Sequence, residues 1–398
     1  MKRKAATVRI KNVLSNYDAI LAILVLAICA FGLVMIYSAS SYRAAYYYGD
    51  SKLYFKNQGM FIIIGAFLMV VVSMVDYKFY FRKLKLLKIP PVILLWLVCL
   101  GLQWFVFFSG HTVGGSARWI KIGAFSIQPS EIAKVCFVLG GSFVAARKKK
   151  LINTGSSIKN IIGVIFLYFL FAPILAPVAL QNLSSAVILA AILTCIYFCT
   201  SMNKKYFGFV LIALAVAVGL LVVFKGYRSE RLMHWWYPET MDPADQIMQG
   251  MYAIASGGLF GKGLGNSVQK LGNMPEVHTD MIFTIICEEL GIIGGIALIG
   301  LFLLLLWRIF SIALKAPDLY GALIATGVFG QIAVQVMMNI AVVTNTMPAT
   351  GVPLPFVSYG GSNLLILMAE IGVVLNVSKK TTDPIPDEDE EEDDMLLS

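Results

Sequence analysis

The stretch Ile292-Ile-Gly-Gly-Ile-Ala-Leu-Ile-Gly-Leu-Phe-Leu-Leu-Leu-Leu-Trp307 contains no charged or amide side chain. Ile20–Ile36 is a second run of this kind. Roughly ten runs along the chain approach the length of about 20 apolar residues that a membrane-spanning helix needs. A transmembrane β-barrel would instead alternate apolar and polar residues in short segments. The sequence therefore predicts an all-α polytopic membrane protein.

The composition supports the same fold class. Hydrophobic residues make up 58% of the 398 residues, charged residues make up 14%, and the mean hydropathy is +0.78. A typical soluble domain is about 25% charged. The apolar runs predict ten transmembrane helices, at 17–38, 58–75, 87–108, 128–146, 160–179, 183–201, 206–224, 280–306, 319–341 and 361–377.

The distribution of charge predicts the orientation of these helices. Of the 32 Lys and Arg residues, 21 fall on the side of the membrane that holds both termini, which makes that side the cytoplasm. Residues 225–279 then form a large extracellular loop between helices 7 and 8. Residues 1–380 form the membrane domain, and 381–398 form an acidic cytoplasmic tail that we expect to be disordered. In a membrane protein, excess cationic loops set topology, so we expect no nucleic-acid partner.

Two outside segments carry unusual patterns. The large loop contains a Trp-rich amphipathic stretch, Arg231–Tyr237, that suits a membrane surface, followed by a predicted helix at 245–256 and a Gly-rich turn at 257–265. The segment 344–362 is too apolar for a solvated loop and too rich in Pro and Gly for a helix. We expect it to dip back into the protein, where irregular backbone is tolerated.

Ionisable side chains at membrane depth are costly, so they are candidates for function. Glu131 and Lys134 lie three residues apart on one helix face, and they either neutralise each other or serve a site. Glu370 lies within the last span, where it is either functional or close enough to the inner interface to be solvated.

A second group of candidates lies around the eighth span. Asp280 begins this span, and it either performs chemistry or only complements a helix N-terminus, a use worth ~0.3–1 kcal/mol. Glu288 and Glu289 follow two turns later, where we expect them to bond across helices or face a cavity. His278 is either an acid/base group or an ordinary loop residue.

Common catalytic motifs are absent from the sequence. Gly261-Lys-Gly-Leu-Gly265 is neither a P-loop nor a dinucleotide fingerprint, and the three histidines lack zinc-binding spacing. We therefore expect no nucleotide cofactor. What remains is a carboxylate, Asp280, on the same side of the membrane as the cations Arg118, Lys121, Lys262 and Lys270. Such cations suit a lipid phosphate headgroup and such a carboxylate suits a general base, so the residues predict a lipid-phosphate enzyme or transporter.

At these residues the sequence resembles the SEDS family (shape, elongation, division and sporulation), from Asp18 to Asn376. The motifs that carry the resemblance are Gly114-Gly-Ser-Ala-Arg-Trp-Ile-Lys-Ile-Gly123, Phe125-Ser-Ile-Gln-Pro-Ser-Glu-Ile-Ala-Lys134, Gly263-Leu-Gly-Asn-Ser267, Pro275-Glu-Val-His-Thr-Asp280 with Glu288-Glu-Leu-Gly291, and Pro353-Leu-Pro-Phe-Val-Ser-Tyr-Gly-Gly361. The stretches Gly32–Ser40 and Tyr227–Arg231 resemble the division and sporulation branch (FtsW-like) more than the elongation branch (RodA-like).

The resemblance implies roles for individual residues. Asp280 matches the essential aspartate of the family, and Arg118, Trp119, Glu131 and Lys134 match its cavity-lining motif. We also expect Lys262, His278 and Ser358 to contact the substrate. Two departures fall at Gln181-Asn-Leu-Ser-Ser185, where the family usually reads Pro-Asp-Leu-Gly, and at Asn345-Thr-Met-Pro-Ala-Thr350, where it usually reads Gly-Leu-Leu-Pro-Val-Thr.

The family polymerises peptidoglycan glycan strands from lipid II at the outer leaflet of the bacterial plasma membrane. The resemblance therefore implies an inverting, septal glycosyltransferase that releases undecaprenyl pyrophosphate, with or without a divalent cation such as Mg²⁺ or Mn²⁺. It also implies partners, namely a class B penicillin-binding protein transpeptidase and other divisome proteins. A lipid II flippase and a non-catalytic divisome scaffold remain alternatives. The sequence leaves open the division, sporulation or elongation role, the identity of a metal, and whether the partner is obligatory.

Overall fold

The computed structural model describes residues 17–84, 88–109, 111–113, 116–122, 125–148, 157–201, 205–223, 232–233, 235–237, 246–271 and 277–380. The expected acidic tail, 381–398, lies outside these ranges. The helices are α2 (Ala19–Tyr48), α3 (Leu53–Met74), α4 (Pro91–Ser109), α5 (Pro129–Arg147), α7 (Ser157–Gln181), α8 (Leu183–Thr200), α9 (Lys205–Val223), α11 (Gln246–Gly257), α12 (Ile282–Lys315), α13 (Leu319–Val343) and α14 (Gly361–Lys380). Two short 3₁₀ helices are η1 (Tyr77–Phe81) and η3 (Gln269–Leu271).

The helical membrane fold predicted from the sequence is confirmed. Within the described residues, nine helices are long and apolar enough to cross a membrane. The remaining predicted span, 206–224, coincides with α9. Its continuous apolar stretch with described side chains, Gly208–Gly219, is shorter than a full membrane span. The predicted helix at 245–256 is α11.

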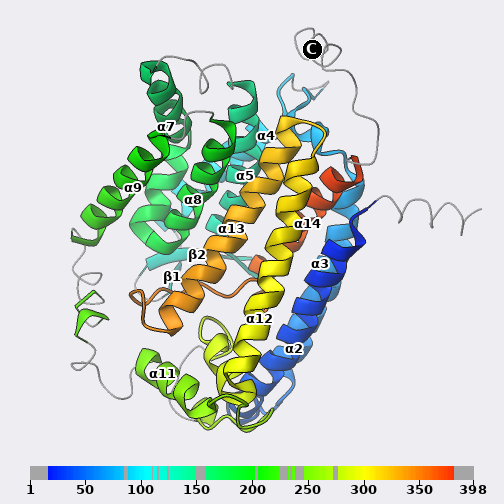
Figure 1. The fold of residues 1–398 in the computed structure, drawn as a ribbon, viewed down its shortest axis with the longest axis vertical. Helices are drawn as coiled ribbons and strands as arrows, with labels where there is room; N and C mark the ends of the chain where they lie inside the picture. The colour runs from blue at the N-terminus through cyan, green and yellow to red at the C-terminus, as the bar shows by residue number, and fades with distance from the viewer. Residues whose placement is uncertain are drawn as a thin grey trace, which may run out of the picture.

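The helices form a bundle in which α5, α13 and α14 lie at the centre (Figure 1). These three helices are mostly buried inside the protein, whereas only 22% of the residues in the apolar stretches of α3 and α4 are buried. In a membrane those exposed side chains face lipid. The central helices are also the ones that carry Glu131, Lys134 and Glu370, so these charges are shielded from lipid by the outer helices.

The start of α2 and the ends of α12 and α14 lie together at one end of the bundle. Asp18 Oδ2 lies 2.6 Å from Arg308 Nε near the end of α12. The Asp18 backbone N–H donates to Ser378 Oγ near the end of α14, at 3.2 Å. The first and last helices of the membrane domain therefore begin and end on the same side. We call this the Asp18 end, and the opposite end, where α11 lies and α12 begins, the Asp280 end (Figure 1).

A small antiparallel sheet between α4 and α5 was not predicted from the sequence. Its strands are β1 (His111–Val113), β2 (Ser116–Ile122) and β3 (Phe125–Ile127), in the order β1-β2-β3. Trp119 is opposite His111, and Ile120 is opposite Ile127. The strands are short, so their alternation is too brief to stand out beside apolar helices. The all-α description therefore needs this addition.

The segment 344–360 enters the protein, as its composition predicted. Val352, Leu354, Phe356 and Val357 are buried although the backbone is not helical. A Cβ on Gly32, in the middle of α2, would lie 2.7 Å from Val357 Cα. The segment therefore reaches the level of the membrane helices, and a glycine in α2 provides the space for it.

Helix α12 is broken at Gly291, which has φ 74° and ψ −177°. The segment that follows α11 supplies the missing backbone partners. Lys262 N and Gly263 N donate to Glu288 O and Glu289 O, each at 2.9 Å, and Ile292 N donates to Gly258 O at 2.9 Å. The loop thus forms backbone hydrogen bonds with α12 on both sides of the break, and these bonds fix the position of the short half-helix 282–290.

We predict that Gly291→Ala destabilises the fold strongly. A non-Gly residue with positive φ and ψ near 180° costs about 1–3 kcal/mol, and a Cβ on residue 291 would also lie 2.2 Å from Leu259 O. Thermal unfolding of the purified variant should show a large loss of stability. Gly300→Ala is the matched control, because a Cβ there meets nothing within 4 Å in the same helix. Equal stability of the two variants would contradict this account of the break.

Candidate functional site

Asp280 lies half-buried just before α12, held by elements that are distant in sequence. Gln246 Nε2, at the start of α11, donates to Asp280 Oδ1 at 3.2 Å. Asn339 Nδ2 on α13 donates to the Asp280 backbone carbonyl at 2.8 Å and to Val352 O at 2.9 Å. The Asp280 carboxylate is therefore oriented by a neutral amide. The backbone of Asp280 is fixed against both α13 and the segment 344–360, which we call the re-entrant segment.

Asp280 lies next to the N-terminus of α12 but makes no side-chain capping bond to it. Helix α12 begins at Ile282, its N-cap is Met281, and no side chain caps it. Asp280 Oδ2 lies 3.7 Å from the position that a Cβ of residue 351 would take. The carboxylate thus lies beside Gly351, where the absence of a side chain leaves room next to one of its oxygens.

His278 and Ser358 belong to the same neighbourhood. The Tyr359 backbone N–H donates to His278 O at 2.8 Å. The His278 ring lies 4.3 Å from the Tyr54 ring and 5.5 Å from the Tyr359 ring, centroid to centroid. Ser358 Oγ is buried and accepts the Leu354 N–H at 2.8 Å. Ser358 therefore stabilises the turn that places Tyr359, and its expected contact with substrate stays a prediction.

The small sheet is connected to this neighbourhood by the start of α14. Ser362 Oγ donates to Ser126 O in β3 at 2.7 Å. In the adjacent strand β2, Arg118 Nε donates to Gln181 O at the end of α7, at 3.1 Å, and Trp119 is half-buried. Arg118 and Asp280 are thus linked through the sheet and the segment 358–362.

Glu131 and Lys134 form the pair that their spacing predicted. Lys134 Nζ lies 2.8 Å from Glu131 Oε1, and both side chains are buried. Glu370 is 2% exposed and accepts Gln331 Nε2 at 2.7 Å, so the solvated position allowed for Glu370 is wrong. Gln331, Gln335 and Asn339 recur every four residues on one face of α13, and this buried polar face leads toward Asp280.

Lys262 and Lys270 both bind glutamates of α12. Lys262 Nζ lies 2.8 Å from Glu288 Oε1, and Lys270 Nζ lies 2.9 Å from Glu289 Oε1. Ser38 on α2 also donates to Glu289 Oε1, at 2.7 Å. Glu288 and Glu289 therefore bond across elements, as expected. A substrate contact by Lys262 would have to compete with its ion pair, and it stays a prediction.

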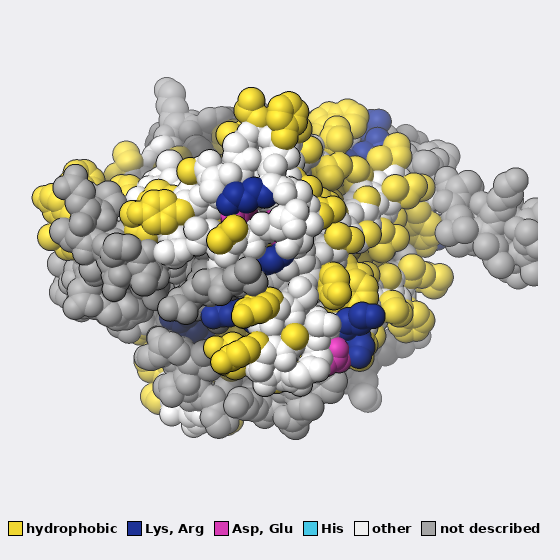
Figure 2. All heavy atoms as spheres, turned by 90° about the horizontal axis from the view of Figure 1, so that it is seen from below, with side chains coloured by type: hydrophobic (Ala, Val, Ile, Leu, Met, Phe, Trp, Pro, Cys, Tyr) yellow, Lys and Arg dark blue, Asp and Glu magenta, His cyan; other side chains and the backbone are white. Residues whose placement is uncertain are grey.

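The Asp280 end presents small groups of basic side chains set among apolar and neutral surface (Figure 2). The structure brings Asp280 together with His278, and it joins Arg118 to them indirectly. It keeps the buried Glu131–Lys134 pair deeper in the bundle. Lys121 was also expected here, but its side chain lies outside the described residues. Gln246 and Asn339 were missed because they lie 34 and 59 positions from Asp280, and an amide carries no sequence signal of its own.

These features together define a class of protein. A bundle of membrane helices holds a carboxylate and an arginine near one membrane face, above a buried polar centre. This is the arrangement of a polytopic membrane protein with a polar site at the level of lipid headgroups.

Comparison with known proteins identifies the family. A family model described as "Cell cycle protein" (FtsW, RodA and SpoVE) matches residues 18–383, so the chain belongs to that family. Stage V sporulation protein E of Bacillus subtilis (strain 168) is 39% identical over 366 residues, which cover 91% of this chain and 97% of that protein. A probable peptidoglycan glycosyltransferase FtsW of Trichlorobacter lovleyi is 36% identical over 373 residues, covering 92% of this chain and 94% of that protein.

Solved structures confirm the fold. A chain from a peptidoglycan synthase complex that coordinates polymerization and crosslinking matches with a TM-score of 0.75 and 26% identity, covering 92% of this chain and 99% of that chain. The rod shape determining protein RodA of Thermus thermophilus matches with a TM-score of 0.67 and 26% identity, covering 92% of this chain and 98% of that chain.

The buried Glu131–Lys134 pair yields a prediction. Breaking a buried pair from one side leaves an unpaired charge and costs about 3–5 kcal/mol. Glu131→Gln and Lys134→Met should each reduce folded yield, measured by size-exclusion chromatography after extraction. If the pair is structural, the double variant restores both yield and activity. If it restores yield while activity stays low, the pair also binds substrate. Normal yield from both single variants would show that the pair does not stabilise the fold.

Proposed function

We propose that this protein is a peptidoglycan glycosyltransferase that polymerises lipid II at the outer leaflet during septal cell-wall synthesis. The observation that carries the proposal is Asp280, which lies half-buried at one membrane face with its carboxylate oriented by Gln246. Two relatives, 36% and 34% identical over most of the chain, are named probable peptidoglycan glycosyltransferase FtsW, which supports this activity.

The proposed reaction is a single displacement. The Asp280 carboxylate takes the proton of the acceptor sugar 4-hydroxyl, and the hydroxyl oxygen attacks the anomeric carbon of the donor. The bond from that carbon to the pyrophosphate oxygen breaks, and undecaprenyl pyrophosphate leaves with the electron pair. Attack from the face opposite the leaving group converts the α-linkage to a β-linkage, as in inverting glycosidases.

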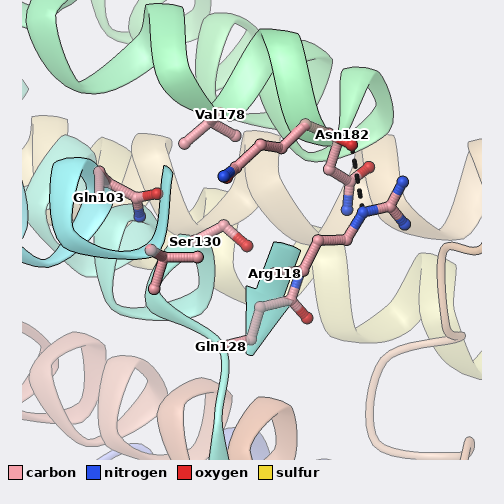
Figure 3. A pocket seen from close by; sticks show the side chains of 8 residues that line it. Gln103, Arg118, Gln128, Ser130, Val178 and Asn182 are labelled. Carbon is pink, nitrogen blue, oxygen red and sulfur yellow. Dashed lines mark hydrogen bonds between the residues drawn. The ribbon is translucent and has the colours of Figure 1, made fainter. Parts of the chain in front are cut away.

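Arg118 is the cation that we assign to the anionic headgroup. Its guanidinium is held by Gln181 O (Figure 3), so its orientation is set before a ligand arrives. The described residues contain no group of three or more His, Cys, Asp or Glu side chains that could hold a metal ion. The side chains of Gln246 and Thr279, which hydrogen-bond to the Asp280 carboxylate, are an amide and a hydroxyl, and they do not complete a site for Mg²⁺ or Mn²⁺ with it. The proposed steps therefore use side chains alone.

We further propose a class B penicillin-binding protein transpeptidase as partner, together with other divisome proteins. The similarity to a chain of a peptidoglycan synthase complex supports a partnered enzyme. The site would face the outside of a bacterial plasma membrane, with both termini in the cytoplasm. The joint position of Asp18, Arg308 and Ser378 supports termini on one common side.

Asp280→Asn tests the chemistry. The amide keeps the size of the side chain but cannot accept a proton at neutral pH. Loss of a general base should lower the rate of polymerisation by at least ~100-fold, with normal expression and normal partner binding. The assay is a gel of the products from purified lipid II, beside a pull-down of the transpeptidase.

Asp50→Asn is the matched control for this experiment. Asp50 lies outside the spans, where a hydrogen bond from Lys56 lowers the pKa of its carboxyl, so it is also an ionised carboxylate. This variant should polymerise at the wild-type rate. Near wild-type polymer from Asp280→Asn would remove Asp280 from the mechanism. Transport of lipid II across vesicles without polymer from the wild type would favour a flippase, and neither activity would favour a scaffold.

Cysteine labelling tests the orientation. In a variant whose six native cysteines are replaced, a cysteine at Val268 should react with a membrane-impermeant maleimide in intact cells. Val268 is 59% exposed at the Asp280 end, which the charge distribution places outside. A cysteine at Lys148, exposed at the other end, should react only after the cells are opened. The reverse pattern would overturn the topology.

A further inference from the structure

The Asp18 end of the bundle exposes positive charge. Exposed cationic side chains occur there at the end of η1, before α4, at the end of α5 and at the end of α12. We call five of them the basic surface, and they are Arg82, Lys88, Arg147, Lys148 and Lys315. Within the described residues, no carboxylate is exposed at this end. The surface therefore favours an anionic ligand.

The carboxylates described at the Asp18 end are partly buried and bind other groups. Asp18 binds Arg308, as described above. Asp76 accepts the Lys78 backbone N–H at 2.9 Å, and Asp318 Oδ2 lies 3.3 Å from Lys78 Nζ. These contacts involve no residue of the basic surface, so they leave its positive charge in place.

The cations of the basic surface gather because η1, α5 and α13 meet beneath them. The Phe81 ring at the end of η1 lies 6.4 Å from the Phe143 ring of α5 and 4.4 Å from the Tyr320 ring of α13, centroid to centroid. Arg147 lies over the Phe143 ring, with its guanidinium carbon 4.8 Å from the centroid. Lys315 ends α12, and a short turn connects it to α13. These elements therefore present their charges on one face of the molecule.

The last helix ends beside this face. Helix α14 ends at Lys380. Near that end, Asn376 Oδ1 accepts the Tyr77 backbone N–H of η1 at 2.9 Å. A Cβ on Gly321, in the first turn of α13, would lie 3.2 Å from Val377 Cγ1. The end of α14 is thus packed against η1 and α13, and the chain after Lys380 starts next to the basic surface.

The chain after Lys380 has the opposite charge. Nine of the 16 residues 383–398 are Asp or Glu, eight of them in the unbroken run Asp387–Asp394, and no Lys or Arg follows Lys380. An extended chain spans at most about 3.3–3.6 Å per residue, so the start of this run can lie up to about 25 Å from the end of α14. Packed helices are only about 8–10 Å apart, and both α5 and α13 contact α14. The acidic run is therefore long enough to reach the basic surface.

We propose that the acidic run Asp387–Asp394 binds the basic surface of the same molecule. Each exposed ion pair contributes little by itself. Several pairs act together here, and attachment to α14 holds the run at an effective concentration in the millimolar range. Bound there, the run occupies cations that would otherwise attract other anions. The contact involves neither Asp280 nor Arg118, so it does not depend on the proposed activity.

Lipid headgroups are the competing anions, and the position of the surface favours the acidic run over them. Arg147 and Lys148 lie at the end of α5, and Lys315 precedes the start of α13. Both α5 and α13 are central helices, mostly buried by their neighbours. The outer helices therefore separate this part of the surface from the surrounding bilayer, whereas the chain after Lys380 starts beside it.

Carbodiimide crosslinking of the intact chain tests the contact. The full-length protein is placed in phosphatidylcholine nanodiscs that hold one copy each, so every crosslink is intramolecular, at about 0.1 M salt. The reagent activates a carboxyl group, a lysine amine attacks it, and an amide bond forms as the urea leaves. Mass spectrometry identifies the linked peptides. We expect links from residues 387–394 to Lys148 and to Lys315.

The ion pair between Lys56 and Asp50 is the internal control. Lys56 Nζ lies 2.8 Å from Asp50 Oδ2 at the opposite end of the bundle, and both side chains are exposed. At about 1 M salt the screening length falls from about 10 Å to about 3 Å, so links from the acidic run should fall at least about fivefold. The Lys56–Asp50 link should change by less than about twofold, because both residues are held on one turn at the start of α3.

Two arginines allow the charge to be changed without removing a reactive amine, because arginine does not react with the carbodiimide. The double variant Arg82→Gln, Arg147→Gln should lower the links to Lys148 and Lys315 by about fivefold, the expected loss for two exposed ion pairs. Lys52→Gln is the control, since it removes an exposed cation at the opposite end, and it should leave these links within about twofold of wild type.

Three outcomes would overturn the proposal. One is the absence of links from residues 387–394 in a sample in which the Lys56–Asp50 link forms. A second is equal linkage of the acidic run to Lys52 and to Lys148, which would show that it does not select the basic surface. The third concerns nanodiscs that contain phosphatidylglycerol, in which we expect the links to persist. Their loss there would assign the basic surface to lipid headgroups.

Discussion

The structure depends on one constraint of the membrane interior, where every backbone N–H and C=O must find a partner within the protein. Helix α12 breaks this rule locally at Gly291, and the loop after α11 restores it. The carbonyls of Glu288 and Glu289 accept Lys262 N and Gly263 N, and Ile292 N donates to Gly258 O. Without this exchange, the half-helix that follows Asp280 would end in unpaired groups at membrane depth.

The same region shows how buried charge is handled. Glu288 and Glu289 are fully buried, and each binds a lysine from the inserted loop. Such pairs contribute little net stability, because desolvation offsets most of the attraction, but loss of either partner is costly. The two ion pairs therefore fix the position of the loop relative to α12. Two lysines that the sequence offers as headgroup ligands are thus bound to glutamates of α12.

The sequence predicted features that depend on local pattern. Long apolar runs predicted the membrane helices, and the i,i+3 spacing predicted the Glu131–Lys134 ion pair. Features that depend on contacts across the chain were missed. Lys262 and Glu288 are 26 positions apart, and Gln246 and Asp280 are 34 apart, so no periodicity connects them. The small sheet was missed because its strands are too short to show a pattern.

The position of Asp280 links the fold to the proposed chemistry. Its carboxylate is oriented from α11, its backbone is fixed from α13, and Gly351 leaves space beside it from the re-entrant segment. Asn339 holds Asp280 O and Val352 O with one amide nitrogen, so α12 and the re-entrant segment cannot separate there without losing a buried hydrogen bond. A general base works only when its oxygen stays within reach of the proton it removes. The irregular segments, which the membrane tolerates only inside protein, are therefore what hold that oxygen in place.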